Sequence, residues 1–383
     1  MTDTVSAPPL IAVCANQAWN LVNFRAGLIA DLIERGFRVL AVAPADAAMA
    51  ERLVDMGCTF EAVAIDSAGV SPRRDLATLL AFRRVIARHR PAAWLSWTIK
   101  PNVYGSLASR LAGVPAFPNV SGLGTAFIRR NLLTRLVRQL YRTGFARAAV
   151  VFFQNADDQA MFVSSGLVRE DQARLLPGSG VDPERWQPAG QARPRPRTFL
   201  MLARVVADKG VREFAMAART VRAAWPDARF RLMGPLEVEN RTAVPAAEVA
   251  AWEADGSIEY CPPVDDVRRA IAEADFVVLP SYREGLSRVL LEAAALGRPI
   301  VTTDVPGCRD IVRDGENGFL CEPRDAAALA AALDRAARTD DRDWARMATA
   351  GRARVIREFS QARVTALYLK ALNDHGIVVH PAL

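Results

Sequence analysis

Two glutamates, Glu284 and Glu292, stand eight residues apart in the segment of the sequence best suited to bind an anion. The apolar residues Phe276–Leu279 end at Pro280, and this pattern predicts a strand, a turn that carries Glu284 and a helix that carries Glu292. The helix N-terminus would lie between the carboxylates, where free N–H groups and the positive end of the helix dipole favour a phosphate. Hydroxyl groups on either side of the phosphates could then donate to the glutamates. The pattern therefore indicates a nucleotide sugar, with ribose at one end and a hexose at the other.

The segment around these glutamates resembles the donor-site signature of the retaining GT-B glycosyltransferases of family 4, in which seven residues separate two glutamates. The resemblance implies that Glu292 holds the ribose hydroxyls and that Glu284 contacts the donor sugar. It also places Gly285, Leu286 and Ser287 among the substrate-binding residues, with the hydroxyl or N–H of Ser287 directed at a phosphate. The alternatives are that both glutamates are solvated acids at a helix end and that Ser287 only caps the helix.

A second segment, Met201–Gly210, resembles the strand-end Gly-Arg-Leu-x-x-x-Lys-Gly motif of the same family, with Ala203 in place of the usual glycine. The resemblance gives Arg204 and Lys209 catalytic roles beside Glu284. Two cations beyond a strand end can neutralise a diphosphate leaving group as charge develops on it in the transition state; alternatively they are ordinary surface charges. The sequence has no Asp-x-Asp at a strand end and no dinucleotide or P-loop glycine motif. We therefore expect a metal-independent enzyme that uses no cofactor.

The loop Tyr260–Asp266 occupies the position where the backbone commonly reads the nucleotide base in this family. The resemblance therefore places Pro263 and Val264 at the nucleotide. Because backbone recognition needs no particular side chain, the loop does not distinguish uracil from guanine.

Two N-terminal segments, Thr98–Asn102 and Ser121–Thr125, resemble the Thr-Ile-Lys-Pro-Asn and Thr-Gly-Leu-Gly-Thr motifs of a family subgroup. That subgroup extends polyprenyl-diphosphate-linked sugars in capsule, O-antigen and N-glycan precursor assembly. The resemblance implies that Lys100 pairs with a diphosphate and that Gly122 lies in a loop whose N–H groups approach an oxyanion. The alternatives are a surface lysine and a plain strand-to-helix turn.

Many family members carry a histidine near the donor in the N-terminal domain. The histidine of that domain in this sequence, His89, precedes Pro91 in a pattern typical of an exposed helix end. The role of the histidine is therefore vacant or replaced, and Asn119 and Thr125 are the candidate substitutes.

The composition describes a two-domain protein without a pattern for crossing a membrane. The 383 residues suffice for two domains, and a hydrophobic fraction of 51% supports real cores. No apolar run is long enough to predict a transmembrane helix, and the N-terminus lacks the pattern of a signal peptide. The cysteines lack metal-binding spacing, so we expect reduced, mostly buried thiols in a cytoplasmic protein. They are Cys14, Cys58, Cys261, Cys308 and Cys321.

Positive charge is concentrated in one part of the chain. The span Leu76–Ala156 contains no Asp or Glu but twelve Lys and Arg residues. Such a bias implies an anionic partner, which could be lipid headgroups, a diphosphate or a nucleic acid.

The residues 127–150 within this span predict an amphipathic helix. Apolar residues share one face, and basic residues share a neighbouring face. The apolar residues are Leu133, Leu136, Val137, Leu140 and Tyr141, and the basic ones are Arg135, Arg138 and Arg142. The pattern fits an interfacial helix that buries its apolar face in an anionic membrane surface. The alternative is that the apolar face packs into the protein core.

Short apolar strands alternate with helical patterns along the whole chain, which predicts an α/β fold with parallel sheets. The expected strands are 10–15, 38–43, 93–97, 115–119, 150–153, 199–203, 230–233, 276–279 and 299–303. A first helix is expected near 24–35, and a Pro-rich segment at 187–197 reads as a linker. The resemblance implies a GT-B fold of two Rossmann-like domains that face each other across a cleft. The expected domains are 1–190 on the acceptor and membrane side, 191–357 at the donor, and a helix at 358–383 that crosses back to the first.

The predicted function is glycosyl transfer with retention at the anomeric carbon. The donor would be a nucleotide sugar, UDP-linked by expectation, and the transferred group a hexose or N-acetylhexosamine. The acceptor would be a lipid-diphosphate-linked saccharide of surface polysaccharide biosynthesis, at the inner face of the cytoplasmic membrane. Two other functions stay open: a GT-B nucleotide-sugar epimerase, and a basic nucleic-acid-binding protein, for which the usual aromatic stacking motifs are missing.

Overall fold

A computed structural model of the protein describes residues 7–66, 71–123, 132–188 and 197–379. The chain divides into two compact units: unit 1 comprises Met1–Ser179 and Gln361–Leu383, and unit 2 comprises Gly180–Ser360. The first boundary, between Ser179 and Gly180, precedes the boundary expected at residue 190 in the Pro-rich segment. The reason is that the N–H of Val181 donates to the carbonyl of Phe359 at 3.0 Å and Trp186 packs into the core of unit 2.

Unit 1 contains a seven-stranded parallel sheet with the order β3-β2-β1-β4-β5-β6-β7. Its strands are β1 (Leu10–Cys14), β2 (Arg38–Ala43), β3 (Thr59–Ala62), β4 (Ala93–Trp97), β5 (Ala116–Val120), β6 (Val151–Phe153) and β7 (Ala173–Leu175). All residues of β1, β4 and β5 are buried, as expected for central strands of a parallel sheet that has helices on both faces.

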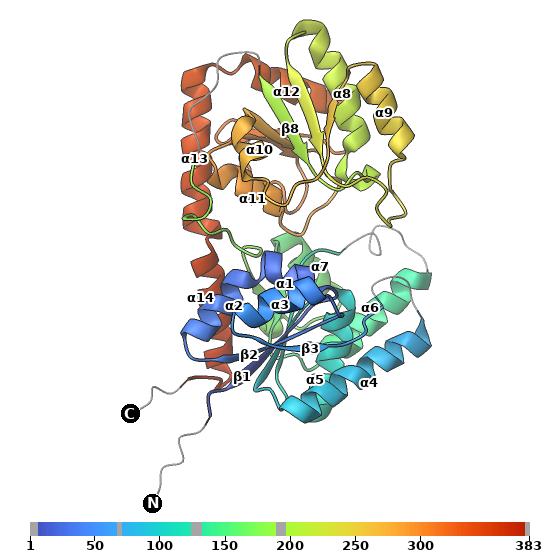
Figure 1. Ribbon diagram of the computed structural model, residues 1–383, viewed down its shortest axis with the longest axis vertical. Helices are drawn as coiled ribbons and strands as arrows, with labels where there is room; N and C mark the ends of the chain where they lie inside the picture. Colours follow the sequence, from blue (N-terminus) through green and yellow to red (C-terminus); the bar gives the residue numbers. More distant parts are fainter. Residues whose placement is uncertain (1–6, 67–70, 124–131, 189–196, 380–383) are drawn as a thin grey trace, which may run out of the picture. The chain divides into compact units, whose positions relative to one another are not determined.

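Helices cover both faces of this sheet (Figure 1). One layer consists of α1 (Ala18–Phe24), α2 (Ala26–Glu34), α3 (Ala47–Asp55) and the C-terminal α14 (Gln361–Asp374). The other consists of α4 (Pro72–His89), α5 (Ser106–Ala112), α6 (Leu132–Phe145) and α7 (Ala156–Ser164). Each layer forms a separate hydrophobic core with its side of the sheet. Helix α14 contributes Val364, Tyr368 and Leu372 to the first of these cores.

The helix expected near 24–35 is present as α2, and the structure adds α1, which precedes it and ends at Arg25. Arg25 has a φ of −126°, which ends α1 and begins α2. The residue is buried, and its guanidinium lies 4.7 Å from the centre of the Trp97 ring. A cation over an indole ring is an energetically favourable contact, so the break points Arg25 into the unit instead of into water.

The prediction that the apolar face of α6 contacts a membrane was wrong for Val137 and Tyr141. Val137 and Tyr141 are buried in the core of unit 1, where Tyr141 contacts Phe145 edge to face. An amphipathic helix can bury its apolar face against a sheet as well as in a bilayer, so the sequence pattern fits both environments. Leu136 and the arginines of the helix are exposed. The residues expected to continue this helix before Leu132 lie outside the described part of the chain.

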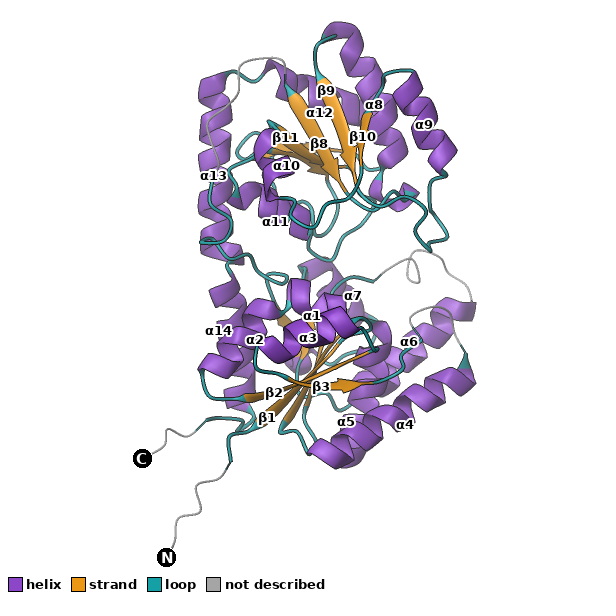
Figure 2. Cartoon of the chain, viewed as in Figure 1, coloured by secondary structure: helices purple, strands orange, loops and turns teal. Residues whose placement is uncertain are grey.

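Unit 2 contains a six-stranded parallel sheet with the order β10-β9-β8-β11-β12-β13. Of these strands, Figure 2 labels β8, β9, β10 and β11. Its strands are β8 (Thr198–Leu202), β9 (Arg229–Met233), β10 (Glu259–Cys261), β11 (Phe276–Leu279), β12 (Ile300–Thr303) and β13 (Gly318–Cys321). Its helices are α8 (Val211–Ala224), α9 (Ala246–Ala254), α10 (Arg268–Glu273), α11 (Arg288–Ala295), α12 (Ala326–Arg338) and α13 (Asp341–Phe359). Helix α8 packs on α12, and α11 packs on α13.

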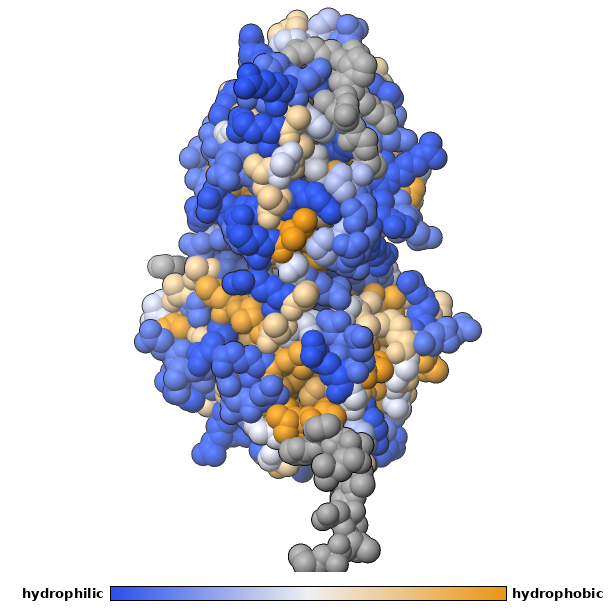
Figure 3. Space-filling model, turned by 90° about the vertical axis from the view of Figure 1, so that its left-hand side faces the viewer, coloured by the Kyte–Doolittle hydropathy of each residue, from blue (hydrophilic) through white to orange (hydrophobic). Residues whose placement is uncertain are grey.

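The surfaces of the units differ on the face shown in Figure 3, where hydrophilic residues predominate on unit 2 and hydrophobic residues form patches on unit 1. All five cysteines are buried free thiols, as expected. Among the described residues, no helix combines the length and the apolar character needed to cross a bilayer.

Candidate active site

The candidate donor site lies at the carboxyl edge of the unit 2 sheet, where the strand order reverses. The chain runs from β8 to β9 on one side of β8 and later returns to β11 on the other side. Ligands of open α/β sheets bind at such a switch point, because the outgoing loops diverge there and leave a crevice. Lys209 lies in the loop after β8, and Glu284 lies in the loop after β11. The topology thus brings together two residues predicted from separate motifs.

Glu284 is held by two donors at this point. The Nζ of Lys209 forms a short ion pair with Oε1 of Glu284, and the hydroxyl of Ser281 donates to the same oxygen at 2.6 Å. The side chains of Lys209 and Glu284 are 23% and 13% exposed, so a ligand can reach both. A phosphate bound by Lys209 would compete with the ion pair and free Glu284 to accept a hydrogen bond from a sugar hydroxyl.

Two glycines allow the loops of the site to lie against each other. Gly210 has a φ of +76°, and a Cβ atom there would lie 2.2 Å from the carbonyl oxygen of Pro280. Gly307 has a φ of +79°, and its Cβ would lie 2.6 Å from the carbonyl oxygen of Gly285 and 2.7 Å from that of Glu284. Any other residue at either position would strain the backbone and push the loops apart.

Glu292 is a buried acid on α11, with 8% of its surface exposed. Burial raises the pKa of its carboxyl, while Arg288 and Arg185 act in the opposite direction. Arg288 lies one helical turn earlier, and its Nε donates to Oε1 of Glu292 at 2.6 Å. Ribose hydroxyls would donate to the charged form, so the two arginines offset part of the cost of keeping a buried carboxylate ionised.

Arg204 differs from the other charged residues of the site in its pairing. It is exposed in the loop after β8, and it forms no hydrogen bond or ion pair within the described part of the chain. Its guanidinium is therefore available to an external anion.

The residues between Glu284 and α11 have distinct environments. Gly285 is buried, Leu286 is half-buried, and Ser287 occupies the N-cap position of α11 without a capping hydrogen bond from its side chain. The N–H of Ser287 donates to the carbonyl of Gly307 at 3.2 Å. Of the two groups predicted to reach a phosphate, the hydroxyl is therefore the available one.

Pro263 and Val264 are exposed in the loop after β10. Val264 retains 47% of its surface, which leaves it open to contact a flat base. The hydroxyl of Tyr260 in β10 donates to the carbonyl of Gly234 at 2.9 Å, which joins the end of β10 to the residue that follows β9.

Lys100 is neither a free cation nor a surface lysine. Its Nζ lies 2.8 Å from Oδ1 of Asp75, and its side chain is 13% exposed. Asp66 contributes a second carboxylate oxygen at 3.7 Å. Burial, with a contribution from Asp75, raises the pKa of the neighbouring Tyr104. The ion pair attaches the first turn of α4 to the loop after β4, so the geometry gives Lys100 a structural task, and its contact with a diphosphate remains a prediction.

Asn119 is completely buried at the carboxyl end of β5. Its Nδ2 donates to the hydroxyl of Tyr368 at 2.7 Å. Its Oδ1 accepts from Ser121 at 3.2 Å and from Gln154 at 3.3 Å. The side chain thus connects β5 and the loop after β6 to α14. These hydrogen bonds give Asn119 a structural role, and its contact with substrate remains a prediction.

The remaining N-terminal candidates occupy different edges of the sheet. Gly122 lies in the loop that follows β5, with a φ of +141°. His89 ends α4 and precedes β4, which is the amino edge, away from the carboxyl edge where ligands bind. Its Nε2 lies 3.4 Å from Oε2 of Glu61. Thr125 lies outside the described residues.

Three residues near the donor candidates were not assigned from the sequence: Ser281, Arg288 and Arg185. Ser281 and Arg288 had a local signal, because they stand three residues before Glu284 and one turn before Glu292. Arg185 had none, since it is distant in sequence from Glu292. The described residues contain no group of three or more His, Cys, Asp or Glu side chains that could hold a metal ion.

Two protein-family models match the chain. The model described as "Glycosyl transferase 4-like domain" matches residues 23–179, and the model described as "Glycosyl transferases group 1" matches residues 196–339. One relative is the N,N'-diacetylbacillosaminyl-diphospho-undecaprenol alpha-1,3-N-acetylgalactosaminyltransferase of Campylobacter jejuni, which is 25% identical over 81% of this chain and 84% of its own. Another is the glycogen synthase of Mycobacterium tuberculosis, which is 33% identical over 45% of each chain.

Solved structures share the fold over nearly the full chain. HepE of Anabaena, crystallised with UDP and glucose, has a TM-score of 0.77 and 18% identity, with 96% of this chain and 100% of that chain covered. A glycosyltransferase of Rickettsia africae has a TM-score of 0.76 and 15% identity, with 96% and 98% covered. At these identities the likeness concerns the fold, which is the GT-B architecture of two Rossmann-like units.

Proposed function

The chain belongs to the family 4 glycosyltransferases of the GT-B fold, and from this premise we propose that it transfers a hexose or N-acetylhexosamine from a UDP-sugar to a lipid-diphosphate-linked saccharide. The product would be a precursor of a surface polysaccharide such as capsule or O-antigen. The observation that carries the proposal is the meeting of Lys209 and Glu284 at the switch point of the unit 2 sheet. The acceptor class is supported by the relative from Campylobacter jejuni, whose name specifies a diphospho-undecaprenol acceptor. UDP is supported by its presence in the HepE crystal structure.

In this proposal each donor residue has one task. Arg204 and Lys209 bind the diphosphate and stabilise the charge that develops when the glycosidic bond to it breaks. Glu284, released from Lys209, positions the hexose, and the Ser281 hydroxyl keeps its carboxylate in place. Glu292 accepts hydrogen bonds from the ribose, and the hydroxyl of Ser287 contacts a phosphate.

The reaction would proceed with retention at the anomeric carbon and without a metal ion. The acceptor hydroxyl attacks the face from which UDP departs, and the departing phosphate accepts its proton. Such a mechanism asks the protein for positioning and charge stabilisation, and the two cations of the site provide the charge. Because a lipid-diphosphate acceptor stays in the bilayer, the enzyme would bind peripherally to the inner face of the cytoplasmic membrane.

The test combines nucleotide binding with product analysis. Thermal shifts against UDP, GDP, CDP and dTDP identify the base, since a ligand at 100 times its dissociation constant stabilises by about 2.7 kcal/mol. Turnover of the matching nucleotide sugars, with a short-chain diphosphate-linked acceptor and EDTA present, then tests the transfer. Nuclear magnetic resonance of the product gives the anomeric configuration.

Three results would contradict parts of the proposal. Isomerisation of a UDP-sugar without acceptor would indicate an epimerase. An inverted product would remove the retaining mechanism. Failure of every nucleotide to raise the melting temperature would remove the donor site.

A further inference from the structure

The outer side of the helix layer formed by α4, α5 and α6 exposes large apolar side chains. Leu76 and Leu80 of α4 are 55% and 39% exposed, Leu111 of α5 is 59% exposed, and Leu136 of α6 is 47% exposed. Helix α5 packs against both α4 and α6, so the three helices form one layer (Figure 1). Single exposed leucines are ordinary on a protein surface, but four in one layer form a candidate contact surface.

The same layer carries exposed arginines that have no acidic partner. The following arginines form no ion pair within the described residues: Arg83, Arg84, Arg110, Arg135, Arg138 and Arg142. No Asp or Glu occurs between Leu76 and Ala156, so any acidic partner must come from outside this span, as Glu61 does for Arg88. On α4, Arg83 and Arg84 follow Leu80 by one helical turn, so exposed leucines and arginines adjoin each other on its outer face. We name these six arginines and the four leucines the leucine–arginine surface.

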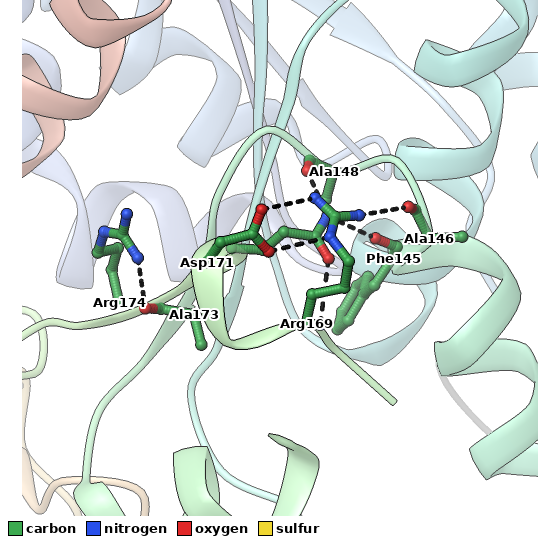
Figure 4. A network of polar contacts seen from close by, with 8 residues as sticks. Phe145, Ala146, Ala148, Arg169, Asp171, Ala173 and Arg174 are labelled. Atoms are coloured by element: carbon green, nitrogen blue, oxygen red, sulfur yellow. Dashed lines mark hydrogen bonds and ion pairs between the residues drawn. The ribbon is translucent and has the colours of Figure 1, made fainter. Parts of the chain in front are cut away.

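Helix α6 is fixed within this layer at its C-terminal end (Figure 4). The amide of Gln172 donates to the carbonyl of Phe145 at 3.2 Å, and the Nη1 of Arg169 donates to the carbonyl of Ala146 at 3.2 Å. The last carbonyl groups of the helix are thus satisfied inside unit 1, while its apolar face lies in the core. The orientation of α6 in unit 1 is thus fixed, with its arginines and Leu136 on the exposed side.

We propose that the leucine–arginine surface docks the protein on an anionic lipid bilayer. Leu76 and Leu80 would insert among the acyl chains, and the arginines would contact the headgroups, with their aliphatic parts along the interface. The inference rests on the proposed function, because a lipid-diphosphate acceptor must be met at the bilayer, and it deepens that function by naming the surface.

The apolar component is what favours a bilayer over a nucleic acid. Both partners would attract unpaired arginines. A nucleic acid, however, is bound through polar groups at phosphates and through aromatic side chains that stack on bases. The large exposed apolar residues described on these three helices are all leucines, which suit acyl chains.

Co-sedimentation with vesicles tests the surface. The vesicles consist of phosphatidylcholine alone or of phosphatidylcholine with phosphatidylglycerol, at low and high salt. The variants are Leu76→Asn with Leu80→Asn, and Arg83→Glu with Arg84→Glu. The matched control is Met216→Asn on α8 of unit 2, which is 56% exposed and lies outside the surface. Circular dichroism melting verifies that each variant folds.

We expect wild-type binding to require phosphatidylglycerol and to fall with salt. The arginine variant should bind at least roughly thirtyfold more weakly, because it loses two basic residues at the membrane surface and gains two acidic ones. The leucine variant should also bind more weakly, and the Met216→Asn control should match wild type. Both surface variants should keep wild-type turnover of a water-soluble, short-chain acceptor.

The outcomes separate the docking surface from the proposed function. Equal binding to neutral and anionic vesicles, binding to neither, or unchanged binding by both variants overturns the docking surface. Loss of an RNA gel shift in the arginine variant, with vesicle binding unchanged, would assign the arginines to nucleic acid instead. If wild type turns over no acceptor but binds anionic vesicles through this surface, the proposed function fails and the docking surface stands.

Discussion

Arginines are arranged differently on the surfaces of the two units. On unit 2, several helix-surface arginines lie beside acids: the Nε of Arg212 is 2.7 Å from Glu248, and the Nε of Arg338 is 2.7 Å from Asp334. On unit 1, the arginines of the leucine–arginine surface have no such partner among the described residues. Paired charges cancel over short distances, whereas a cluster of unpaired charges projects a potential into the solvent.

The exceptions show what the difference teaches. Arg204 is an unpaired, exposed arginine of unit 2, and it lies at the candidate donor site. Lys100 belongs to the acid-free span of unit 1, yet it is buried against Asp75, which precedes that span. At these two positions, the unpaired Arg204 is assigned to an external anion, and Lys100 with its buried partner has a structural task. Lys209 is intermediate, since its partner Glu284 is itself a candidate ligand of the donor.

The substitution Lys100→Ala tests whether Lys100 has a structural role or binds substrate. We expect a loss of about 3–5 kcal/mol in the free energy of unfolding, because Asp75 would be left buried without a counter-ion. Urea unfolding measures this. The matched double variant, Lys100→Met with Asp75→Leu, should recover most of the stability. A stable Lys100→Ala protein with weakened acceptor binding would return Lys100 to the role that the family resemblance implies.

Lys209→Ala and Arg204→Ala test the cations assigned to the donor. Each should lower turnover by roughly 10²–10³, the usual effect of removing a group that stabilises transition-state charge. Arg212→Ala is the control, because this arginine is on the neighbouring helix and is paired with Glu248. Activity should persist in EDTA. Dependence on added Mg²⁺ or Mn²⁺ would show that a metal, and not this pair, neutralises the diphosphate.

Glu284→Gln and Glu292→Gln should separate turnover from nucleotide binding. Glu292→Gln should weaken UDP binding by about 1.5–3 kcal/mol, the contribution of a hydrogen bond to a charged acceptor. Glu284→Gln should leave UDP affinity near wild type and reduce turnover, since its assigned ligand is the hexose. Isothermal titration with UDP and steady-state kinetics measure the two effects. Equal loss of UDP affinity in both variants would remove the separate assignments.

Glu292 also predicts a dependence of stability on pH. Burial raises its pKa in the folded protein, so the folded state holds the proton more tightly than the unfolded chain. At low pH the carboxyl is protonated in both states, and its burial carries no charge penalty. As the pH rises through the raised pKa, the buried carboxyl must ionise and the folded state loses stability. Without nucleotide at neutral pH, Glu292→Gln should therefore melt at a higher temperature than wild type, and the difference should shrink in acid. A lower melting temperature at neutral pH would mean that the pairing with Arg288 outweighs the cost of burial.

The sequence identified the centres of both sheets and missed their edges. The expected strands correspond to β1, β2, β4, β5 and β6 in unit 1 and to β8, β9, β11 and β12 in unit 2. The unpredicted strands β3, β7, β10 and β13 are the outermost strands of the two sheets within the described chain. A central parallel strand is buried on both faces and shows a continuous apolar run, but a short edge strand such as β3 is largely exposed and lacks this signal.

The positions of the candidate site residues were predictable where the sequence pattern is local. Glu284, Glu292, Arg204 and Lys209 stand in strand–loop–helix patterns, and the structure places them on loops or a helix as expected. Contacts between distant segments were not predictable. The hydrogen bond from Asn119 to Tyr368 spans 249 positions, and the pairing of Lys100 with Asp75 depends on how α4 crosses the sheet. Sequence patterns fix which residues begin a helix or end a strand, but not which distant side chain neutralises them.

The smallest expected effects come from removing one paired arginine of unit 2 and one unpaired arginine of unit 1. Arg212→Ala on unit 2 removes an exposed ion pair, so we expect a loss of at most about 1 kcal/mol in unfolding free energy and no change in vesicle binding. Arg84→Ala on unit 1 removes an unpaired charge, so its stability should stay within about 0.5 kcal/mol of wild type. Its binding to phosphatidylglycerol vesicles should fall about fivefold, as expected for one basic residue at a membrane surface. Urea unfolding and vesicle co-sedimentation of both variants give the comparison. If Arg84→Ala cost as much stability as a buried ion pair, or if Arg212→Ala weakened vesicle binding, then the absence of a partner would not mark the cations that meet an external anion.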